Sequence, residues 1–330
     1  MRDHGGNLDW AVRHYGGARE GWIDLSTGIN RQPYPVPRIA PEAWTALPAA
    51  DATAALIAAA RLAYGTNAPI LPLAGAQAAI QLIPHLAPPG RAKILTPTYN
   101  EHEAALRAAG WHVEQVAASE ALAGADLAVI VNPNNPDGSH STPDELLALL
   151  PRVGRLVVDE SFGDVQPAIS LAPQAGRDGL IVLRSFGKFY GLAGLRLGFA
   201  VGSATAISAL AEMAGPWPVC GPALQIGAQA LADSAWAEAT RARLQGETTR
   251  LDALAAQAGW RLAGGTGLFR LYETPAAEAA QAHLARAKIW SRIFPYSAQW
   301  LRLGLPGSEA EWDRLEAVLN RISGIHAVQT

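Results

Sequence analysis

Between about residue 50 and residue 230, short apolar runs alternate with segments of helical periodicity. Several runs are almost continuously hydrophobic, as in strands of a sheet covered by helices on both faces. The expected strands are Ile70–Leu73, Lys93–Thr96, Trp111–Val116, Leu127–Val131, Leu156–Asp159, Leu180–Arg184 and Leu197–Val201. The expected helices between them are Ala52–Tyr64, Ala76–His85, Glu101–Ala109 and Pro143–Leu150. The alternation predicts an α/β domain with a mostly parallel seven-stranded sheet between helices.

After Gly221-Pro222 the pattern changes to one or two long helices over Ala223–Leu254 and then to a smaller α+β unit. Its expected strands are Trp260–Leu262, Leu268–Tyr272, Ile289–Ile293 and Trp300–Leu305, and its expected helices are Ala276–Ala287 and Ser308–Ile322. Residues 1–45 are rich in Gly and Pro and are expected to form an N-terminal arm and loops. We therefore expect a large domain over 46–230 and a small C-terminal domain over 231–330.

Composition narrows the class of protein further. The 330 residues are 49% hydrophobic and 17% charged, enough to bury a large core. The net charge is -3 without a basic block, so nucleic acid is not an expected partner. The single cysteine excludes an intramolecular disulfide and a thiolate zinc site, and we expect no metal. Without a signal-like or membrane-length apolar run, the chain is expected to be cytoplasmic, with no membrane partner.

The segment Ser185–Phe199 holds one lysine, Lys188, among apolar residues and glycines. Ser185 lies three residues before the lysine and Arg196 eight after it. Because a buried ammonium is costly, a lysine in such surroundings favours an imine, and the serine and arginine suit a phosphate. This combination points to pyridoxal phosphate held as a Schiff base. For Lys188 taken alone, a solvent-facing loop position is the alternative.

Four further segments place polar or small residues at or near the ends of expected strands, where ligands of α/β sheets bind. The turn within Leu71–Gln77 leads into a helix and could receive a phosphate. Asn132–Gly138 forms a stiff polar turn, and Asp159 and Glu160 end an apolar strand, where an acid could face a pyridine nitrogen. Tyr99 could stack on a flat cofactor. Each segment alone also fits a simpler role as a turn, a cap or a packing residue.

Together these motifs resemble the fold-type-I pyridoxal-phosphate enzymes, the aspartate aminotransferase superfamily. The resemblance rests on Asn-Pro-x-Gly at 135–138, Asp-Glu-x-aromatic at 159–162, and Ser-x-x-Lys at 185–188 with an arginine eight residues later. It implies that Lys188 forms the Schiff base, Asp159 pairs with the pyridine nitrogen and Asn135 donates to the ring hydroxyl. Tyr99 would stack on the ring. The phosphate would be held by Gly75, Ala76, Gln77, Ser185 and Arg196.

Two positions depart from the pattern of this superfamily. Phe162 stands where many members have a tyrosine that donates to the ring hydroxyl. Leu47, in Leu47-Pro48, stands where many members have a tyrosine that reaches the cofactor phosphate of a neighbouring subunit. A leucine cannot donate, so the homodimer that the resemblance implies would lack this contact.

Within the superfamily the chain resembles histidinol-phosphate aminotransferases and the threonine-phosphate decarboxylases of cobalamin biosynthesis. His4-Gly5-Gly6-Asn7 and the segment Ile23–Asn30 are similar to the decarboxylases. The resemblance implies decarboxylation of L-threonine O-3-phosphate, a small phosphorylated amino acid, to (R)-1-aminopropan-2-ol O-2-phosphate. Arg302 would bind the carboxylate. The residues expected at the substrate are His4, Gly6, Asn30, Asn135, Arg292 and Arg302.

Simpler roles remain for two of these residues: His4 could lie in a disordered tail, and Arg292 could form a surface ion pair. The alternative activity is a histidinol-phosphate-type aminotransferase. A transcription regulator with an aminotransferase-like domain is a third possibility, but it would need a basic helix-turn-helix segment. The sequence shows none.

Overall fold

The computed structural model describes residues 5–327, which form two compact units. The large unit consists of Tyr34–Asn135 and Ser139–Glu238. The small unit consists of the described residues up to Pro33, the short segment Pro136–Gly138, and the described residues from Ala239 onward.

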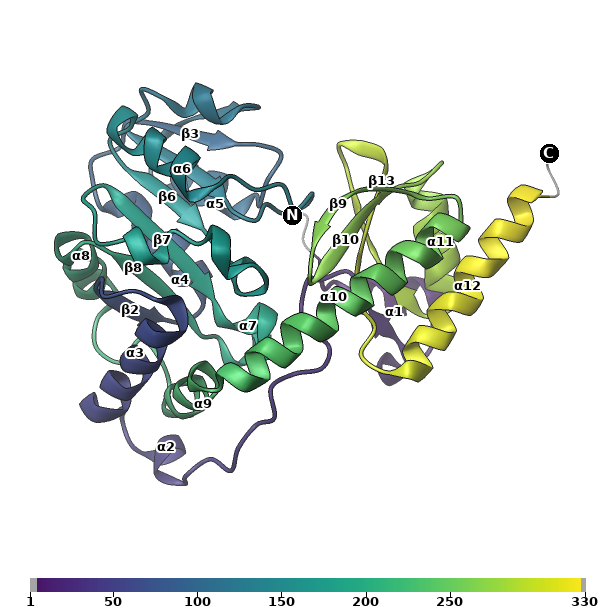
Figure 1. The fold of residues 1–330 in the computed structure, drawn as a ribbon, viewed down its shortest axis with the longest axis horizontal. Helices are drawn as coiled ribbons and strands as arrows, with labels where there is room; N and C mark the ends of the chain where they lie inside the picture. The colour runs from purple at the N-terminus through teal and green to yellow at the C-terminus, as the bar shows by residue number, and fades with distance from the viewer. Residues whose placement is uncertain (1–4, 328–330) are drawn as a thin grey trace. The chain divides into compact units, whose positions relative to one another are not determined.

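The large unit is built on a seven-stranded sheet of order β2-β8-β7-β6-β5-β3-β4 (Figure 1). β8 pairs antiparallel with both β2 and β7, and the other neighbouring strands of this sheet pair parallel. The strands are β2 (Ile70–Leu73), β3 (Arg91–Leu95), β4 (His112–Val116), β5 (Leu127–Val131), β6 (Leu156–Asp159), β7 (Leu180–Ser185) and β8 (Gly198–Gly202). The predicted α/β fold with a mostly parallel sheet is therefore confirmed.

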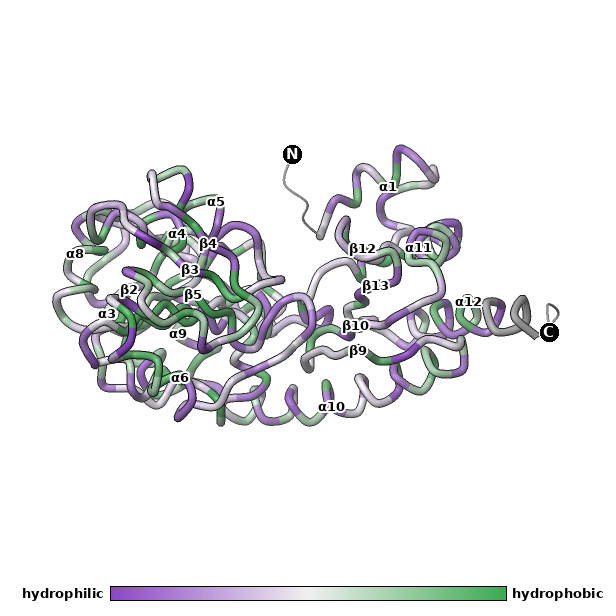
Figure 2. The backbone as a smooth tube through the Cα atoms, turned by 90° about the horizontal axis from the view of Figure 1, so that it is seen from above, coloured by the Kyte–Doolittle hydropathy of each residue, from purple (hydrophilic) through white to green (hydrophobic). Residues whose placement is uncertain are grey.

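Helices cover both faces of this sheet, as the continuously apolar strands require (Figure 2). The helices are α2 (Glu42–Thr45), α3 (Ala50–Tyr64), α4 (Ala76–Leu82), α5 (Glu101–Ala108), α6 (Pro143–Leu149), α7 (Phe186–Phe189), α8 (Ala204–Ala214) and α9 (Gly221–Ala232). Side chains of α4, α5 and α8 form one core cluster with the sheet. On the other face α3 packs against α9. Every residue of β5 and of β6 is buried, which explains their unbroken apolar sequences.

Local signals in the sequence fix several element ends. Thr142 accepts a hydrogen bond from the backbone of Glu145, and the Glu145 side chain accepts one from the backbone of Thr142. This capping box, with Pro143 at the first helical position, begins α6 where the sequence predicts it. Asp233 ends α9, and its side chain accepts a hydrogen bond from Trp236 N, so the predicted helical stretch divides there.

The small unit holds an antiparallel sheet of order β12-β13-β10-β9 and a parallel pair, β1 with β11. The strands are β1 (Ile23–Asp24), β9 (Arg261–Thr266), β10 (Phe269–Glu273), β11 (Ile289–Trp290), β12 (Arg292–Phe294) and β13 (Ser297–Gly304). Its helices are α1 (Leu8–Tyr15), α11 (Ala277–Arg286) and α12 (Glu309–Ala327), with α10 (Ser234–Gln257) beginning in the large unit.

The expected N-terminal arm contains elements that its composition does not predict. Helix α1 packs Leu8 and Ala11 into an apolar cluster with Trp22 and Trp290, and β1 pairs with β11. The apolar residues Leu8, Ala11, Val12 and Tyr15 follow the helical spacing i, i+3, i+4, i+7, but the many Gly and Pro of residues 1–45 favoured an arm and loops over this local signal.

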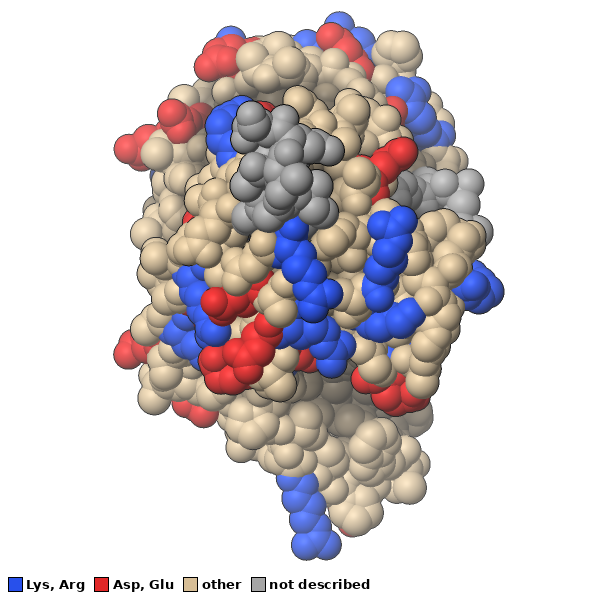
Figure 3. Space-filling view, turned by 90° about the vertical axis from the view of Figure 1, so that its right-hand side faces the viewer, with Lys and Arg blue, Asp and Glu red and all other residues tan. Residues whose placement is uncertain are grey.

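The surface drawn in Figure 3 carries Lys and Arg side chains interspersed with Asp and Glu, separated by wide uncharged areas. This pattern is that of an ordinary solvated surface and agrees with the net charge of -3. No helix within residues 5–327 combines the length and the apolar character needed to cross a bilayer.

Candidate active site

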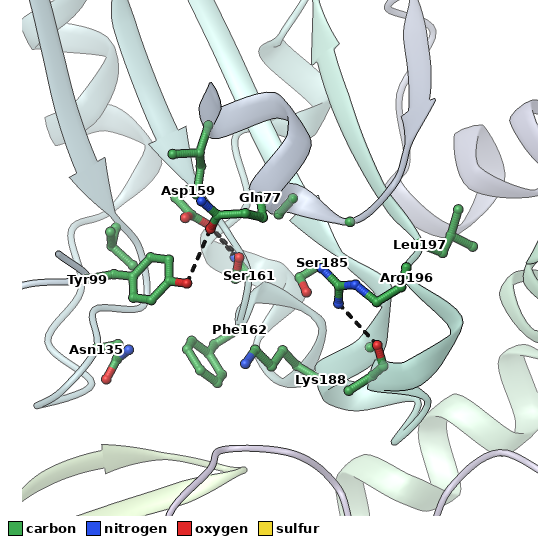
Figure 4. A pocket seen from close by; sticks show the side chains of 16 residues that line it. Gln77, Tyr99, Asn135, Asp159, Ser161, Phe162, Ser185, Lys188, Arg196 and Leu197 are labelled. Carbon is green, nitrogen blue, oxygen red and sulfur yellow. Dashed lines mark hydrogen bonds between the residues drawn. The ribbon is translucent and has the colours of Figure 1, made fainter. Parts of the chain in front are cut away.

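A pocket in the large unit collects all nine residues predicted to bind the cofactor (Figure 4). They come from segments that follow different strands and meet at one edge of the sheet, as expected for ligand sites of parallel sheets. The nine are Gly75, Ala76, Gln77, Tyr99, Asn135, Asp159, Ser185, Lys188 and Arg196. Ser161 and Phe162 also line the pocket.

Lys188 lies on α7, a single helical turn directly after β7. Phe186 and Phe189 on either side of it are fully buried, and the Phe186 ring stacks on Tyr190 with centroids 4.4 Å apart. These aromatic anchors fix the turn, so Lys188 is the side chain directed into the pocket (Figure 4). Its Nζ lies 5.6 Å from the ring centroid of Phe162.

One end of the pocket suits a phosphate. Arg196 has a left-handed backbone (φ 54°), and its Nη1 donates to the carbonyl of Ala193 at 3.1 Å. Gly75 also has positive φ (80°), and a Cβ there would lie 2.7 Å from Arg196 Nη2. Glycine therefore leaves open the space in front of the guanidinium, and Ser185 adds a hydroxyl (Figure 4).

Asp159 is 1% exposed, and each of its oxygens is hydrogen-bonded. Oδ2 lies 2.8 Å from Nε2 of His102, while Oδ1 accepts from the backbone and hydroxyl of Ser161 at 2.9 and 2.5 Å. Burial alone raises the pKa of Asp159, but the partners His102 and Ser161 outweigh it and leave the pKa below its ordinary value. The carboxyl is therefore held as a carboxylate at neutral pH.

Glu160 does not join Asp159 at the pocket, where the sequence placed both acids. Its side chain turns into the protein and accepts from Arg184 Nη1 at 2.7 Å, Ser170 Oγ at 2.5 Å and Leu171 N at 2.6 Å. Arg184 also pairs with Asp164. This buried network anchors the segment after β6 to β7 and so supports Ser161 and Phe162 at the pocket.

Hydrogen bonds between two loops hold Tyr99 and Asn135 in place. Thr98 Oγ1 donates to Asn134 Oδ1 at 2.6 Å, and Asn134 Nδ2 donates to the carbonyl of Pro97 at 2.9 Å. Tyr99 in turn donates from its hydroxyl to Gln77 Oε1 at 3.3 Å (Figure 4). The Asn-Pro turn is thus both a structural turn, as its composition suggests, and the support of a pocket residue.

The predicted substrate residues belong to the small unit, apart from Asn135. Arg302 on β13 and Arg292 on β12 are directly opposite one another in the antiparallel ladder. Arg302 is buried, and its Nη2 donates to the carbonyl of Ser26 at 2.9 Å. Ser26 Oγ accepts from the backbone N–H of Gly6 at 2.7 Å.

Asn30 is also buried in the small unit, a few residues after this contact. His4 lies outside the described residues. The structure thus brings Gly6 and Arg302 to the same residue, Ser26, and sets Arg292 beside Arg302.

The donor set of the pocket fits pyridoxal phosphate, the cofactor that the sequence resemblance implies. The cradle at Gly75, with Arg196 and Ser185, offers positive charge and hydrogen-bond donors for a phosphate. Asp159 offers a carboxylate for a protonated ring nitrogen, and Lys188 offers the amine. These are the three recognition elements that this cofactor needs.

Sequence reasoning missed two residues that act through Asp159. His102 lies on α5 and is 4% exposed, although histidine is rarely so buried without a polar partner. Its position three residues after Tyr99, on the side of the helix that faces the sheet, was the available signal. Ser161 follows Asp159 by two residues, the spacing at which an aspartate accepts a backbone N–H.

The class of protein to which the chain belongs follows from its similarity to known proteins. The family model described as aminotransferase class I and II matches residues 45–319. The chain belongs to this family.

Two curated relatives are similar over nearly the whole length. A threonine-phosphate decarboxylase of Pseudomonas aeruginosa is 47% identical over 326 residues, which cover 97% of each chain. A threonine-phosphate decarboxylase of Sinorhizobium sp is 44% identical over 327 residues, 97% of this chain and 98% of the relative. Among solved structures, histidinol-phosphate aminotransferase from Sinorhizobium meliloti, in complex with pyridoxal-5'-phosphate, superimposes with a TM-score of 0.79. It is 19% identical, with 96% of this chain and 94% of that chain covered, and so supports the fold.

Proposed function

We propose that this chain is a pyridoxal-phosphate-dependent lyase that decarboxylates L-threonine O-3-phosphate to (R)-1-aminopropan-2-ol O-2-phosphate, the linker of the cobalamin nucleotide loop. The two nearly full-length relatives named threonine-phosphate decarboxylase support this assignment. The pocket around Lys188 supports the cofactor.

The observation that carries the proposal is the pair Arg292 and Arg302 on neighbouring strands of the small unit. Two guanidinium groups directly opposite one another in the ladder concentrate positive charge, which suits a ligand that carries anionic groups. An aromatic ring packs against each guanidinium group: the ring centroid of Phe294 lies 5.1 Å from Arg292 Cζ, and that of Phe269 lies 4.8 Å from Arg302 Cζ. A substrate with a carboxylate and a phosphate supplies two anionic groups for two arginines.

The other substrate residues complete the proposed set. Arg302 binds the carboxylate, and Arg292, Asn30 and the N-terminal residues His4 and Gly6 bind the phosphate. The hydrogen bond from Gly6 N to Ser26 Oγ supports this placement, because the carbonyl of Ser26 also accepts from Arg302. Asn135, the remaining member of the set, lines the pocket of the large unit.

Pyridoxal phosphate, when bound, supplies an aldehyde that takes up amines and a ring that accepts the electrons of a bond broken at the substrate Cα. Asp159 would keep a proton on the ring nitrogen because its own carboxyl remains ionised. Tyr99 would stack on the ring. The amine of Lys188 would hold the cofactor through its aldehyde and would return a proton to the substrate Cα. Arg302 and the phosphate-binding residues orient the substrate and thereby select the carboxylate, rather than the Cα proton, as the group that leaves.

We further propose that the protein is a homodimer. The large unit exposes Trp44 (68%) and Leu47 (66%) beside a groove whose lining includes Leu47, Pro48 and Leu224. Exposed apolar side chains around an apolar groove are typical of an interface, and a second copy of the chain is the occupant that the family resemblance suggests. We also propose, from the sequence, that the protein is located in the cytoplasm.

Incubation of the cofactor-loaded enzyme with L-threonine O-3-phosphate tests the reaction. We expect carbon dioxide release without any 2-oxo acid. A requirement for 2-oxoglutarate, with formation of glutamate, would instead identify an aminotransferase.

A further inference from the structure

Asn30 is held by an arginine that no motif in the sequence points to. Its side-chain oxygen accepts two hydrogen bonds, from the backbone N–H of Gln32 at 3.0 Å and from Nη2 of Arg243 at 2.8 Å. Asn30 is 4% exposed, so these contacts are shielded from water. All three residues belong to the small unit.

The two donors to Asn30 are themselves joined by Glu247, one turn beyond Arg243 on α10. Arg243 Nη1 donates to Glu247 Oε2 at 2.7 Å, and Gln32 Nε2 donates to Glu247 Oε1 at 3.1 Å. The four residues therefore form a closed ring of hydrogen bonds. The planar fork of arginine suits this position because it bonds two acceptors at once with fixed geometry.

The chain segment that contains Asn30 is also fixed by the next residue, Arg31. Arg31 forms a two-pronged ion pair with Glu311 of α12, with Nε 3.0 Å from Oε2 and Nη2 2.5 Å from Oε1. Glu311 also accepts from the backbone N–H of Gly307 at 2.6 Å. The backbone of Asn30 is thus held by its neighbour, while the orientation of its amide is set by Gln32 N and Arg243 together.

A carboxamide has an acceptor and a donor on the same carbon, and the two diverge. Two N–H donors occupy the two lone-pair positions of the Asn30 oxygen, so the amide nitrogen must turn away from Arg243. A rotated amide would instead set its own N–H groups against the guanidinium. We propose that Arg243 is a positioning residue that commits Asn30 to donate a hydrogen bond to the substrate phosphate. This inference rests on the proposed function, which places Asn30 at that phosphate.

Binding measurements on the cofactor-loaded enzyme test this role without relying on turnover. We would follow the cofactor absorbance during titration with L-threonine O-3-phosphate and, separately, with L-threonine, which lacks the phosphate. Arg243→Met should raise the Kd for the phosphorylated ligand about tenfold, the effect of losing one hydrogen bond to a charged group, and leave L-threonine unchanged. Lysine has no planar fork, so the Kd of Arg243→Lys for the phosphorylated ligand should lie between those of Arg243→Met and the wild type.

Two further variants separate positioning from stability. Combined with Asn30→Ala, Arg243→Met should add little to the Kd, because both changes remove the same hydrogen bond. Arg250→Met is the matched control: this arginine lies on the same helix and pairs with Glu309 at the surface, so its loss should not alter either Kd.

Wild-type affinity retained in Arg243→Met would overturn the inference, as would an equal loss for both ligands or full additivity with Asn30→Ala. If Arg243→Met does not fold, Arg243→Lys in the same double-mutant comparison decides the question. A wild-type enzyme that does not bind L-threonine O-3-phosphate would instead overturn the proposed function, and with it the role of Asn30 on which this inference rests.

Discussion

The contact between His102 and Asp159 gives a quantitative prediction about cofactor binding. His102→Leu would remove the partner of Asp159 Oδ2, which lies 2.8 Å away in a site shielded from water. A hydrogen bond to a charged group contributes about 1.5–3 kcal/mol, and leaving a buried charged atom unpaired costs a similar amount. With 1.4 kcal/mol per tenfold change, the Kd for pyridoxal phosphate should rise about 10- to 100-fold.

The physical cause is the ionisation of Asp159. Burial raises the pKa of this carboxyl, and the contributions of His102 and Ser161 bring it below the ordinary value. Without His102 the pKa should rise, and a protonated carboxyl cannot keep a proton on the ring nitrogen. The bond from Ser161 would remain, so the loss should be partial.

The assay is titration of the cofactor-free protein with pyridoxal phosphate, followed by absorbance. His112→Leu is the control, because His112 is exposed on β4. An unchanged Kd in His102→Leu, in a protein that melts at the wild-type temperature, would refute the reasoning.

Three further predictions concern packing, assembly and acid stability. Gly198→Ala should destabilise the protein by about 1–3 kcal/mol, because the added Cβ would lie 2.5 Å from the backbone carbonyl carbon of Gly75. Gly246→Ala, on an open helix surface, should not destabilise it. Thermal melting of both variants tests this prediction. Leu47→Lys should shift the protein from dimer to monomer in sedimentation experiments, and a retained dimer would count against the proposed interface. The pKa of Asp159 is lowered in the folded state, so its carboxylate stabilises the fold above the unfolded pKa of about 3.9. This stabilisation is lost as the pH falls through the folded-state pKa. In His102→Leu the pKa is lowered less, so the free energy of unfolding should fall less between neutral and acid pH than in the wild type.

The large sheet and the cofactor pocket could be predicted from the sequence for physical reasons. Strands buried on both faces are apolar without interruption, as in Leu127–Val131, so they are visible as runs. Their carboxyl ends meet at one edge, so a motif after each strand adds to one site. Lys188 and Asp159 lie together in the pocket for this reason.

Other features depend on contacts between residues far apart in sequence. His102 and Asp159 are 57 residues apart, and no local pattern marks the histidine as the partner of that acid. The side chains of Asp159 and Glu160 point in different directions because adjacent residues at a strand end face opposite sides of the sheet. Two adjacent acids in a sequence do not show which of them faces the pocket. Arg243 acts on Asn30 across 213 residues.

The central claim is that the bond to the carboxylate breaks and a proton takes its place. The most direct measurement is nuclear magnetic resonance of the product formed from L-threonine O-3-phosphate in deuterated water. We predict 1-aminopropan-2-ol O-2-phosphate with one deuterium on the carbon that carried the carboxylate. A keto acid product that retains its carboxylate, together with an aminated cofactor, would contradict the account.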